Sequence, residues 1–370
     1  MDFTLSDEQQ ALQDLARQIF ADHGTNERHK ELESAGADRD DPLWGALADS
    51  GLLGIALPEG HGGGGQSFME LAVVLTEQGR HTGRVPFLAS AVMGGLTIAE
   101  FGTDAQQAAW LPGIADGSIV ATAALVEPNR VPEDPALRAV ADGDGWRLDG
   151  VKTCVPAGTQ ADLVLAPARC DDGEVRVFCL ASSADGLTAA RQETMIGIAQ
   201  AELTFDGVRV EADDVLGSDG ASVVRWVVDR AMAAMCATAV GVCEEAVRIT
   251  AEYTKTRQQF DRPIASFQAV GQRAADAYID TQAVRLTALQ AAWRLGQGLP
   301  AEDAIVIAKF WVADGGQRVV HAAQHLHGGM GVDRDYPLHR YFLWAKQLEL
   351  DLGGTHTQLL RLGAEIAASV

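Results

Sequence analysis

The chain has 370 residues, 47% of them hydrophobic and 22% charged, which is long enough for two or three packed domains. Asp and Glu number 51 against 29 Lys and Arg, and the formal net charge of -22 excludes an electrostatic footprint for nucleic acid. The five cysteines form no CxxC pair, the N-terminus is acidic and polar, and long uninterrupted apolar runs are absent, so we expect a cytoplasmic protein outside the membrane.

Apolar residues recur at helical spacing in the first part of the chain, as at Leu12, Leu15 and Ile19. The helices expected there cover residues 6–21, 41–52 and 68–77. These segments predict a helical N-terminal domain over residues 1–117.

The pattern changes near Ile119, where short runs alternate or are β-branched and Gly/Asp turns separate them. The runs cover residues 120–125, 163–166, 175–180 and 203–210. They predict a central β domain over residues 118–217.

Long amphipathic helices joined by short loops follow, which predicts an antiparallel helical bundle over residues 218–370. The expected helices cover residues 222–257, 267–295, 301–325, 338–351 and 355–368. Helices, strands and helices succeed one another without βαβ alternation, so a doubly wound nucleotide-binding sheet is disfavoured. The predicted fold class is a multi-domain α+β protein.

Two histidines near the end of one predicted helix do not indicate a metal site. His325 and His327 are two residues apart and so lie on different faces of a helix, and no Cys or carboxylate stands at ligand spacing. We interpret them as polar residues at a helix end and expect no metal.

Residues 253–268, with the sequence YTKTRQQFDRPIASFQ, leave one long predicted helix through a Pro-containing turn and enter another. This segment resembles the arginine-to-glutamine signature of the acyl-CoA dehydrogenase family. Further family motifs follow the same order over essentially the whole chain: residues 51–59, Glu127-Pro128, residues 149–152, residues 328–331 and residues 335–337.

The resemblance implies a helical N-terminal domain, a central β domain and a C-terminal four-helix bundle, in agreement with the periodicity. It also implies FAD, an acyl-CoA thioester as substrate, an oligomer, and an electron-transfer flavoprotein as electron acceptor. The implied reaction removes a proton from Cα and transfers a hydride from Cβ to flavin N5, giving a 2-enoyl-CoA. Proton removal needs a positioned carboxylate, because the α C–H is only weakly acidic.

In relatives, the residues that match the signature hold the ADP part of FAD belonging to the neighbouring subunit. Arg257 suits pyrophosphate because a guanidinium offers paired donors. The resemblance implies that Phe260 packs beside adenine or ribose and that Gln268 donates or accepts a hydrogen bond.

The Gly-Gly loop completes this ADP-binding half. Gly328 and Gly329 lack Cβ, so the backbone can approach a phosphate or an adenine edge. The family's glutamine falls on His325, with Gln324 one place earlier, and both side chains are candidates.

The flavin-ring half departs from the family at two places. Residues 127–134 read EPNRVPED, without the small residues with which relatives wrap the flavin. Relatives place an aromatic residue and a Thr beside the isoalloxazine, where this chain has Cys154, Val155 and Pro156; Pro has no N–H or hydroxyl to offer N5.

The usual catalytic base is also absent, because the family's Glu-Gly-Thr reads Leu352-Gly353-Gly354-Thr355. Some relatives keep the base on the first bundle helix before an Arg, where Asp229 is the candidate, although anchoring on Gly241 places Ala231 there. Asp351 and Glu349 lie near the lost position, but we expect both to be solvated.

We therefore expect the companion subunit of a heteromeric acyl-CoA dehydrogenase, like the paired enzymes that desaturate steroid side-chain CoA thioesters. Its Glu-bearing partner would hold FAD whose ADP end this chain clamps. The alternatives are a self-sufficient homo-oligomeric dehydrogenase using Asp229, a flavin-free scaffold or CoA-thioester-binding protein, and a related oxidase or hydroxylase.

Overall fold

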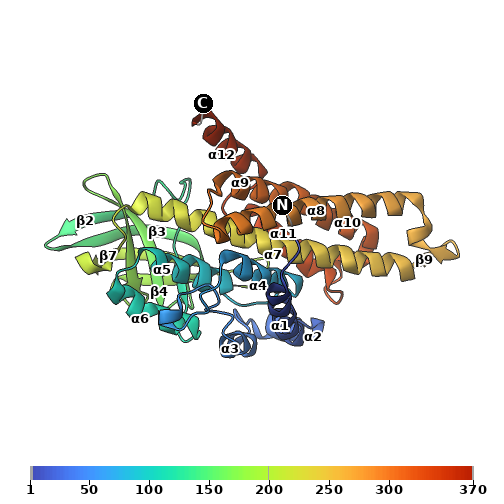
Figure 1. The fold of residues 1–370 in the computed structure, drawn as a ribbon, viewed down its shortest axis with the longest axis horizontal. Helices are drawn as coiled ribbons and strands as arrows, with labels where there is room; N and C mark the ends of the chain where they lie inside the picture. The colour runs from blue at the N-terminus through green and yellow to red at the C-terminus, as the bar shows by residue number, and fades with distance from the viewer. Residues whose placement is uncertain (1–2, 199, 369–370) are drawn as a thin grey trace. The chain divides into compact units, whose positions relative to one another are not determined.

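The structure is a computed structural model that describes residues 3–198 and 200–368 (Figure 1). The chain forms two compact units, each assembled from separate segments. Unit 1 comprises Met1–Ala35, Ser67–Gly83 and Met232–Val370, and unit 2 comprises Gly36–Gln66 and Arg84–Ala231. The three domains expected at 1–117, 118–217 and 218–370 divide the chain at other places and stay a prediction.

Unit 1 is helical. Its helices are α1 (Asp7–His23), α2 (Asn26–Ala35), α4 (Phe68–Arg80), the Met232–Thr256 part of α7 (Gly220–Thr256), α8 (Gln268–Gly296), α9 (Glu302–Trp311), α10 (Gln317–His327), α11 (Leu338–Leu350) and α12 (Thr355–Ala368). Local sequence fixes the start of α4: the Ser67 hydroxyl accepts from the N–H of Met69 at 3.1 Å, and the N–H of Ser67 donates to the Glu70 carboxylate at 3.0 Å, a capping box.

Glycines let α4 and α7 approach closely. A Cβ on Gly79 would lie 1.9 Å from the carbonyl oxygen of Thr238, and one on Gly241 would lie 1.9 Å from that of Thr76. Any larger residue at either position would push the helices apart, so this crossing depends on the two glycines.

Helix α7 is long and apolar enough to cross a membrane by length and composition alone, yet 89% of its apolar window is buried. Such burial is typical of the core helix of a soluble protein.

Unit 2 is built around one sheet. Its strands are β1 (Ala121–Ala123), β2 (Arg138–Asp142), β3 (Gly145–Pro156), β4 (Leu163–Cys170), β5 (Val175–Ala181), β6 (Leu187–Gln192), β7 (Gln200–Val210) and β8 (Val215–Leu216). The strand order is β6-β7-β3-β2-β4-β5-β8, and β1 pairs in parallel with β4. Most neighbours are antiparallel, and Leu148, Phe178 and Phe205 lie in the sheet's buried core.

Short helices complete unit 2: α3 (Asp41–Asp49), a π-helical segment Leu88–Leu96, α5 (Thr97–Phe101) and α6 (Asp104–Ala115). The predicted α+β class, with helical segments at both ends of the chain and a β-sheet between them, is confirmed.

Candidate functional site

A short hairpin joins α7 to α8. Strands β9 (Gln258–Gln259) and β10 (Arg262–Pro263) pair antiparallel, with Phe260 and Asp261 between them at φ 54° and 62°. Two successive left-handed residues form the turn whose twist matches paired strands. The N–H of Ile264 donates to the carbonyl of Arg257 at 2.8 Å and closes the base of the hairpin.

The hairpin displays its side chains instead of burying them. Phe260 is 87% exposed and touches only Phe267 edge-on, with ring centroids 6.1 Å apart, among the aromatic contacts of the described residues. Arg257 is exposed, and within residues 3–198 and 200–368 its guanidinium makes no hydrogen bond or ion pair. Gln268 is exposed at the first position of α8. All three predicted ligand-binding side chains are therefore available to another molecule.

The Gly-Gly loop caps the end of α10. Gly328 has φ 58° and ψ -135°, a conformation that L side chains rarely adopt, and its N–H donates to the carbonyls of Gln324 and His325. A Cβ on Gly328 or Gly329 would meet no atom within 4 Å, so the backbone faces open space. His325 is exposed, whereas Gln324 is half-buried and its Oε1 has no partner among the described residues.

An aromatic stack, not seen in the sequence, joins the hairpin to the Gly-Gly loop. Tyr253, one turn before Arg257, lies face to face with His327 at 4.3 Å. The Nδ1 of His327 lies 2.8 Å from the carbonyl of Ala323 and its Nε2 lies 3.2 Å from the hydroxyl of Tyr336. His327 is the last residue of α10, as expected of a helix-end histidine; it is buried, and burial lowers its pKa. Tyr336, in the motif at residues 335–337, is the sequence signal from which this aromatic contact could have been predicted.

This half of the site fits an anionic, aromatic ligand. An unpaired guanidinium at Arg257 offers paired donors to a diphosphate, and Phe260 offers a ring face. The open backbone at Gly328 and Gly329 allows close approach.

Unit 2 contains Glu127-Pro128 and residues 154–156, which the family resemblance predicts to lie beside the flavin ring. The carboxylate of Glu127 is buried and saturated, because it accepts hydrogen bonds from Lys152 Nζ, from the N–H of Ala136 and, at 3.1 Å, from the N–H of Leu137. Burial lowers the pKa of Lys152 while the contact with Glu127 opposes that shift. The pair fixes the start of the loop after Pro128 and leaves no carboxylate oxygen for a ligand.

Ion pairs between side chains hold that loop in place. Asp134 accepts from Arg130 at 2.8 Å and from Arg169 at 2.5 Å, and Asn129 turns the chain with φ 59°. Such cross-links hold residues 129–134 to their own unit, so the loop lacks the freedom of a small-residue flavin loop.

The backbone N–H of Cys154, expected beside the flavin, already donates to another side chain. Cys154 is left-handed with φ 51°, and its N–H donates to Gln192 Oε1 at 2.8 Å. Pro156 has no N–H, and its carbonyl accepts from Thr122 at 2.6 Å.

Residues 352–355, where the family motif predicts the base, begin just after α11 and contain no carboxylate. Leu352 is left-handed with φ 55°, and Gly353 accepts from Lys309 Nζ at 3.1 Å and from Gln358 at 2.9 Å. Asp351 is half-buried, and burial raises its pKa to about 6, so the expectation of a solvated Asp351 was wrong.

Asp229 lies in unit 2, on the first part of α7, and is half-buried. The neighbouring Arg230 stacks on Trp226 with its guanidinium carbon 3.5 Å from the ring centroid. Its role as a base stays a prediction.

Comparison with known proteins decides the family. Residues 6–118 match the family model "Acyl-CoA dehydrogenase, N-terminal domain", and residues 218–367 match "Acyl-CoA dehydrogenase, C-terminal domain". The chain belongs to the acyl-CoA dehydrogenase family. Members of this flavoprotein family are oxidoreductases that act on CH–CH groups, and FAD is their usual cofactor.

Similar proteins cover the chain from end to end. Acyl-CoA dehydrogenase FadE27 of Mycobacterium tuberculosis is 40% identical, with 99% of each chain covered. The ChsE4-ChsE5 complex from the same organism contains a chain that is 40% identical, with a TM-score of 0.94 and 99% of each chain covered. The Tcur3481-Tcur3483 steroid acyl-CoA dehydrogenase, solved as a G363A variant, gives 43% identity, a TM-score of 0.92 and 99% coverage of both chains.

Proposed function

We propose that the chain is the companion subunit of a heteromeric acyl-CoA dehydrogenase. In this role, its hairpin and Gly-Gly loop clamp the ADP end of an FAD molecule held by a Glu-bearing partner chain. The observation that carries the proposal is an asymmetry: Arg257 and Phe260 are exposed and ready for a ligand, whereas Leu352 and Gly353 stand where the family's base belongs.

The residues present fit one half of FAD. Arg257 would bind the pyrophosphate, Phe260 would pack on adenine or ribose, and the backbone at Gly328 and Gly329 would lie against the ADP edge. Gln268 and either Gln324 or His325 would add hydrogen bonds. When bound, the flavin supplies hydride acceptance, which no side chain can.

The isoalloxazine half of FAD does not fit this chain's own β unit. Glu127 is saturated by Lys152 and backbone donors, the N–H of Cys154 is committed to Gln192, and Pro156 offers no donor. A flavin ring placed there would displace existing hydrogen bonds without gaining equivalent ones.

Similar solved structures support a two-chain enzyme. The ChsE4-ChsE5 complex and the Tcur3481-Tcur3483 steroid enzyme each have two named components. We extend this pairing to the present chain, with a steroid CoA thioester as the substrate class, a cytoplasmic location and an electron-transfer flavoprotein as electron acceptor.

Expression alone and with a Glu-bearing dehydrogenase chain tests the proposal. We expect the chain alone to be colourless and inactive, and the mixed oligomer to retain flavin and to reduce a dye with an acyl-CoA. Arg257→Gln should lower the bound flavin of the mixed oligomer by about tenfold, because a charge-assisted contact to phosphate is lost.

Arg248→Gln is the matched control, because Arg248 is an exposed arginine on α7 that pairs with Glu245 three residues earlier on the same helix. Its flavin content should equal that of the wild type. Stoichiometric FAD and turnover by the chain alone, abolished by Asp229→Asn, would instead support the self-sufficient enzyme. If no mixed oligomer forms and no flavin is retained, the scaffold alternative holds.

A further inference from the structure

The two segments that the proposed clamp needs follow different helices of unit 1. Arg257 and Phe260 follow α7, whereas Gly328 and Gly329 follow α10. One ADP molecule can contact both segments only when they are held at a suitable separation, and its apparent affinity falls with the fraction of molecules in that arrangement. A contact between the ends of α7 and α10 would therefore set the affinity.

Tyr253, on the last turn of α7, makes such a contact. Its carbonyl accepts a hydrogen bond from the N–H of Arg257 at 2.8 Å. Its ring stacks on the ring of His327, with centroids 4.3 Å apart and planes 23° apart, and His327 directly precedes Gly328 in the chain. One hydrogen bond, one ring stack and one peptide bond thus join Arg257 to the Gly-Gly loop.

The ring of His327 is held from its other sides as well. Its Nδ1 lies 2.8 Å from the carbonyl of Ala323, and its Nε2 lies 3.2 Å from the hydroxyl of Tyr336. Tyr336 also packs edge-on against Tyr253, with centroids 6.2 Å apart. The three rings therefore connect both ends of residues 328–335 to α7.

Helix α2 holds the far end of this loop. The side-chain amide of Asn26 donates to the carbonyl of Asp335 at 2.9 Å, and Lys30 pairs with the Asp335 carboxylate at 2.6 Å. Tyr336, the next residue, is thereby kept beside His327.

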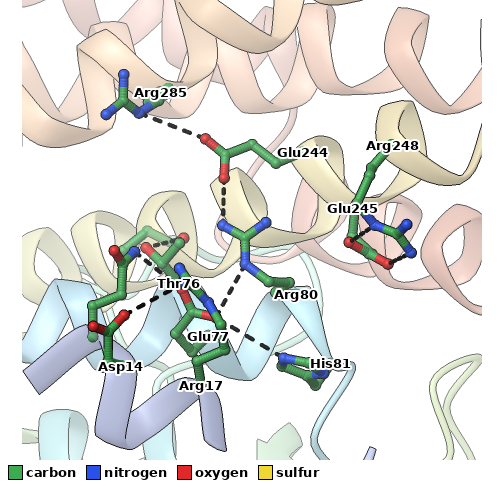
Figure 2. A network of polar contacts seen from close by, with 12 residues as sticks. Asp14, Arg17, Thr76, Glu77, Arg80, His81, Glu244, Glu245, Arg248 and Arg285 are labelled. Atoms are coloured by element: carbon green, nitrogen blue, oxygen red, sulfur yellow. Dashed lines mark hydrogen bonds and ion pairs between the residues drawn. The ribbon is translucent and has the colours of Figure 1, made fainter. Parts of the chain in front are cut away.

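Ion pairs hold α7 further from its end (Figure 2). Glu244 of α7 pairs with Arg80 of α4 and with Arg285 of α8. Nearer the hairpin, in the part of the chain that the structure describes, the side-chain hydrogen bonds and ion pairs of residues 251–257 stay within that stretch, apart from those of Tyr253. Among these polar and aromatic contacts, Tyr253 is the side chain that joins this end of α7 to the Gly-Gly loop.

We propose that Tyr253 is a positioning residue for the ADP part of FAD: its ring, acting through His327, holds the Gly-Gly loop at the place where ADP bound to Arg257 can reach it. This inference rests on the proposed clamp and names the residue that aligns its two segments. The ring carries the effect, because aromatic pairs attract beyond the burial of their surface. The hydroxyl of Tyr253 lies 3.4 Å from the carbonyl of His327, outside the range of about 2.5–3.0 Å for O–H···O bonds.

Titration of the flavin-depleted mixed oligomer with FAD, followed by flavin fluorescence, tests this role. Tyr253→Leu removes the ring but keeps an apolar side chain, and it should raise the dissociation constant of FAD about fivefold. Tyr253→Phe keeps the ring, so its dissociation constant should stay within about twofold of the wild-type value.

Tyr341→Leu is the matched control for a general loss of stability. Tyr341 is buried on α11, and its hydroxyl donates to the carbonyl of Arg80 at 2.9 Å, away from the Gly-Gly loop in the sequence. This variant should lower the melting temperature at least as much as Tyr253→Leu does, because it too removes a buried ring, and should leave the dissociation constant of FAD unchanged.

Hydrogen exchange of the purified chain alone gives a second readout that needs no partner. The N–H of Gly328 donates to the carbonyls of Gln324 and His325. Exchange in the peptide covering residues 325–332 should become faster in Tyr253→Leu, because the loop loses its support, but not in Tyr253→Phe or Tyr341→Leu.

The outcomes separate this inference from the proposed function. If no mixed oligomer forms, or if Arg257→Gln leaves the dissociation constant of FAD unchanged, the clamp itself fails and the positioning role fails with it. If Arg257→Gln weakens FAD binding and Tyr253→Leu does not, the clamp stands and the positioning role is overturned. The positioning role is also overturned if Tyr341→Leu or Tyr253→Phe weakens FAD binding as much as Tyr253→Leu.

Discussion

A single buried ammonium group holds the segment in which the sequence motif predicts the family's base. Lys309 is fully buried, and its Nζ donates to the carbonyls of Leu348 at 2.8 Å, Glu349 at 3.1 Å and Gly353 at 3.1 Å. The carbonyls of Leu348 and Glu349 belong to the last turn of α11, where helices leave carbonyls without an intrahelical partner, so the lysine satisfies them. Burial lowers the pKa of Lys309, which makes its three acceptors essential to keeping the charge.

Lys309→Met should destabilise the protein by about 3 kcal/mol, because methionine fills the space but leaves buried carbonyls unpaired. Lys255→Met, at a lysine that is 63% exposed, should change the unfolding free energy by less than about 0.5 kcal/mol. Urea denaturation of both variants measures the difference. Equal stability of the two variants would show that the carbonyls find other partners.

His327 gives the fold an acid-sensitive point. The carbonyl of Ala323 can only accept, so Nδ1 carries the proton, and Nε2 is left to accept from Tyr336. Because burial lowers the pKa of His327 in the folded state, the unfolded chain binds more protons below about pH 6.5. This contribution to stability is present at neutral pH and is lost as the pH falls below the pKa of the unfolded histidine.

We expect His327→Asn to reduce the decrease in unfolding free energy between pH 7 and pH 5.5. Wild type and variant should be compared by urea denaturation at both pH values. His325→Asn, at an exposed histidine two residues earlier, should keep the wild-type decrease. An identical pH dependence in wild type and His327→Asn would contradict the assignment, because His81 and His339, whose pKa values are also lowered by burial, would then carry the effect.

At the scale of elements, the hairpin between α7 and α8 depends on two residues with unfavourable backbone angles. Asp261 at φ 62° occupies a position that strongly prefers glycine. Asp261→Val should open the hairpin, because a β-branched residue is disfavoured there by about 1–3 kcal/mol. Asp261→Gly should keep it.

Hydrogen exchange at the N–H of Ile264, which donates to Arg257, reports this opening directly. Exchange should become faster in Asp261→Val and not in Asp261→Gly, while the global unfolding free energy changes little because the hairpin is exposed. Unchanged exchange in both variants would show that β9 and β10 do not depend on the turn.

Elements with local signals could be predicted from the sequence, and those that depend on distant partners could not. The helix expected at 68–77 is α4, Phe68–Arg80, because its periodicity and capping box are local. The helix expected at 301–325 is instead α9 and α10 separated by a π-helical segment, Val312–Gly316. A Cβ on Gly315 would lie 3.0 Å from the ring of Trp311, a packing detail that no period reveals.

The candidate site divides in the same way. Arg257 and Gly328 belong to contiguous motifs, so the sequence alone is enough to predict them as site residues. The burial of His327 depends on Tyr253, 74 residues away, and the saturation of Glu127 depends on Lys152, 25 residues away. Such pairings follow from the tertiary fold and leave no periodic trace in the sequence.

At the scale of the whole molecule, the two sets of segments predicted to contact FAD lie in different units. The exposed hairpin and Gly-Gly loop belong to unit 1, whereas Glu127, Cys154 and Pro156 belong to unit 2. Loss of the base alone would leave a dehydrogenase that one substitution could restore. The proposed loss of the ring-binding half as well predicts that no single substitution restores activity.

Leu352→Glu returns a carboxylate to the base position without adding backbone strain, because Leu352 already adopts φ 55°; Gly353→Glu would place its Cβ 2.7 Å from Thr357. We expect the purified Leu352→Glu chain to remain colourless and inactive with acyl-CoA thioesters, since the N–H of Cys154 is committed to Gln192 and Pro156 has no N–H to donate. The mixed oligomer should keep its flavin and its rate. Leu350→Glu, at a 58% exposed leucine on the last turn of α11, controls for added charge. Flavin-dependent turnover by Leu352→Glu alone would mean that unit 2 accommodates the ring after all, and that the missing base is this chain's single defect.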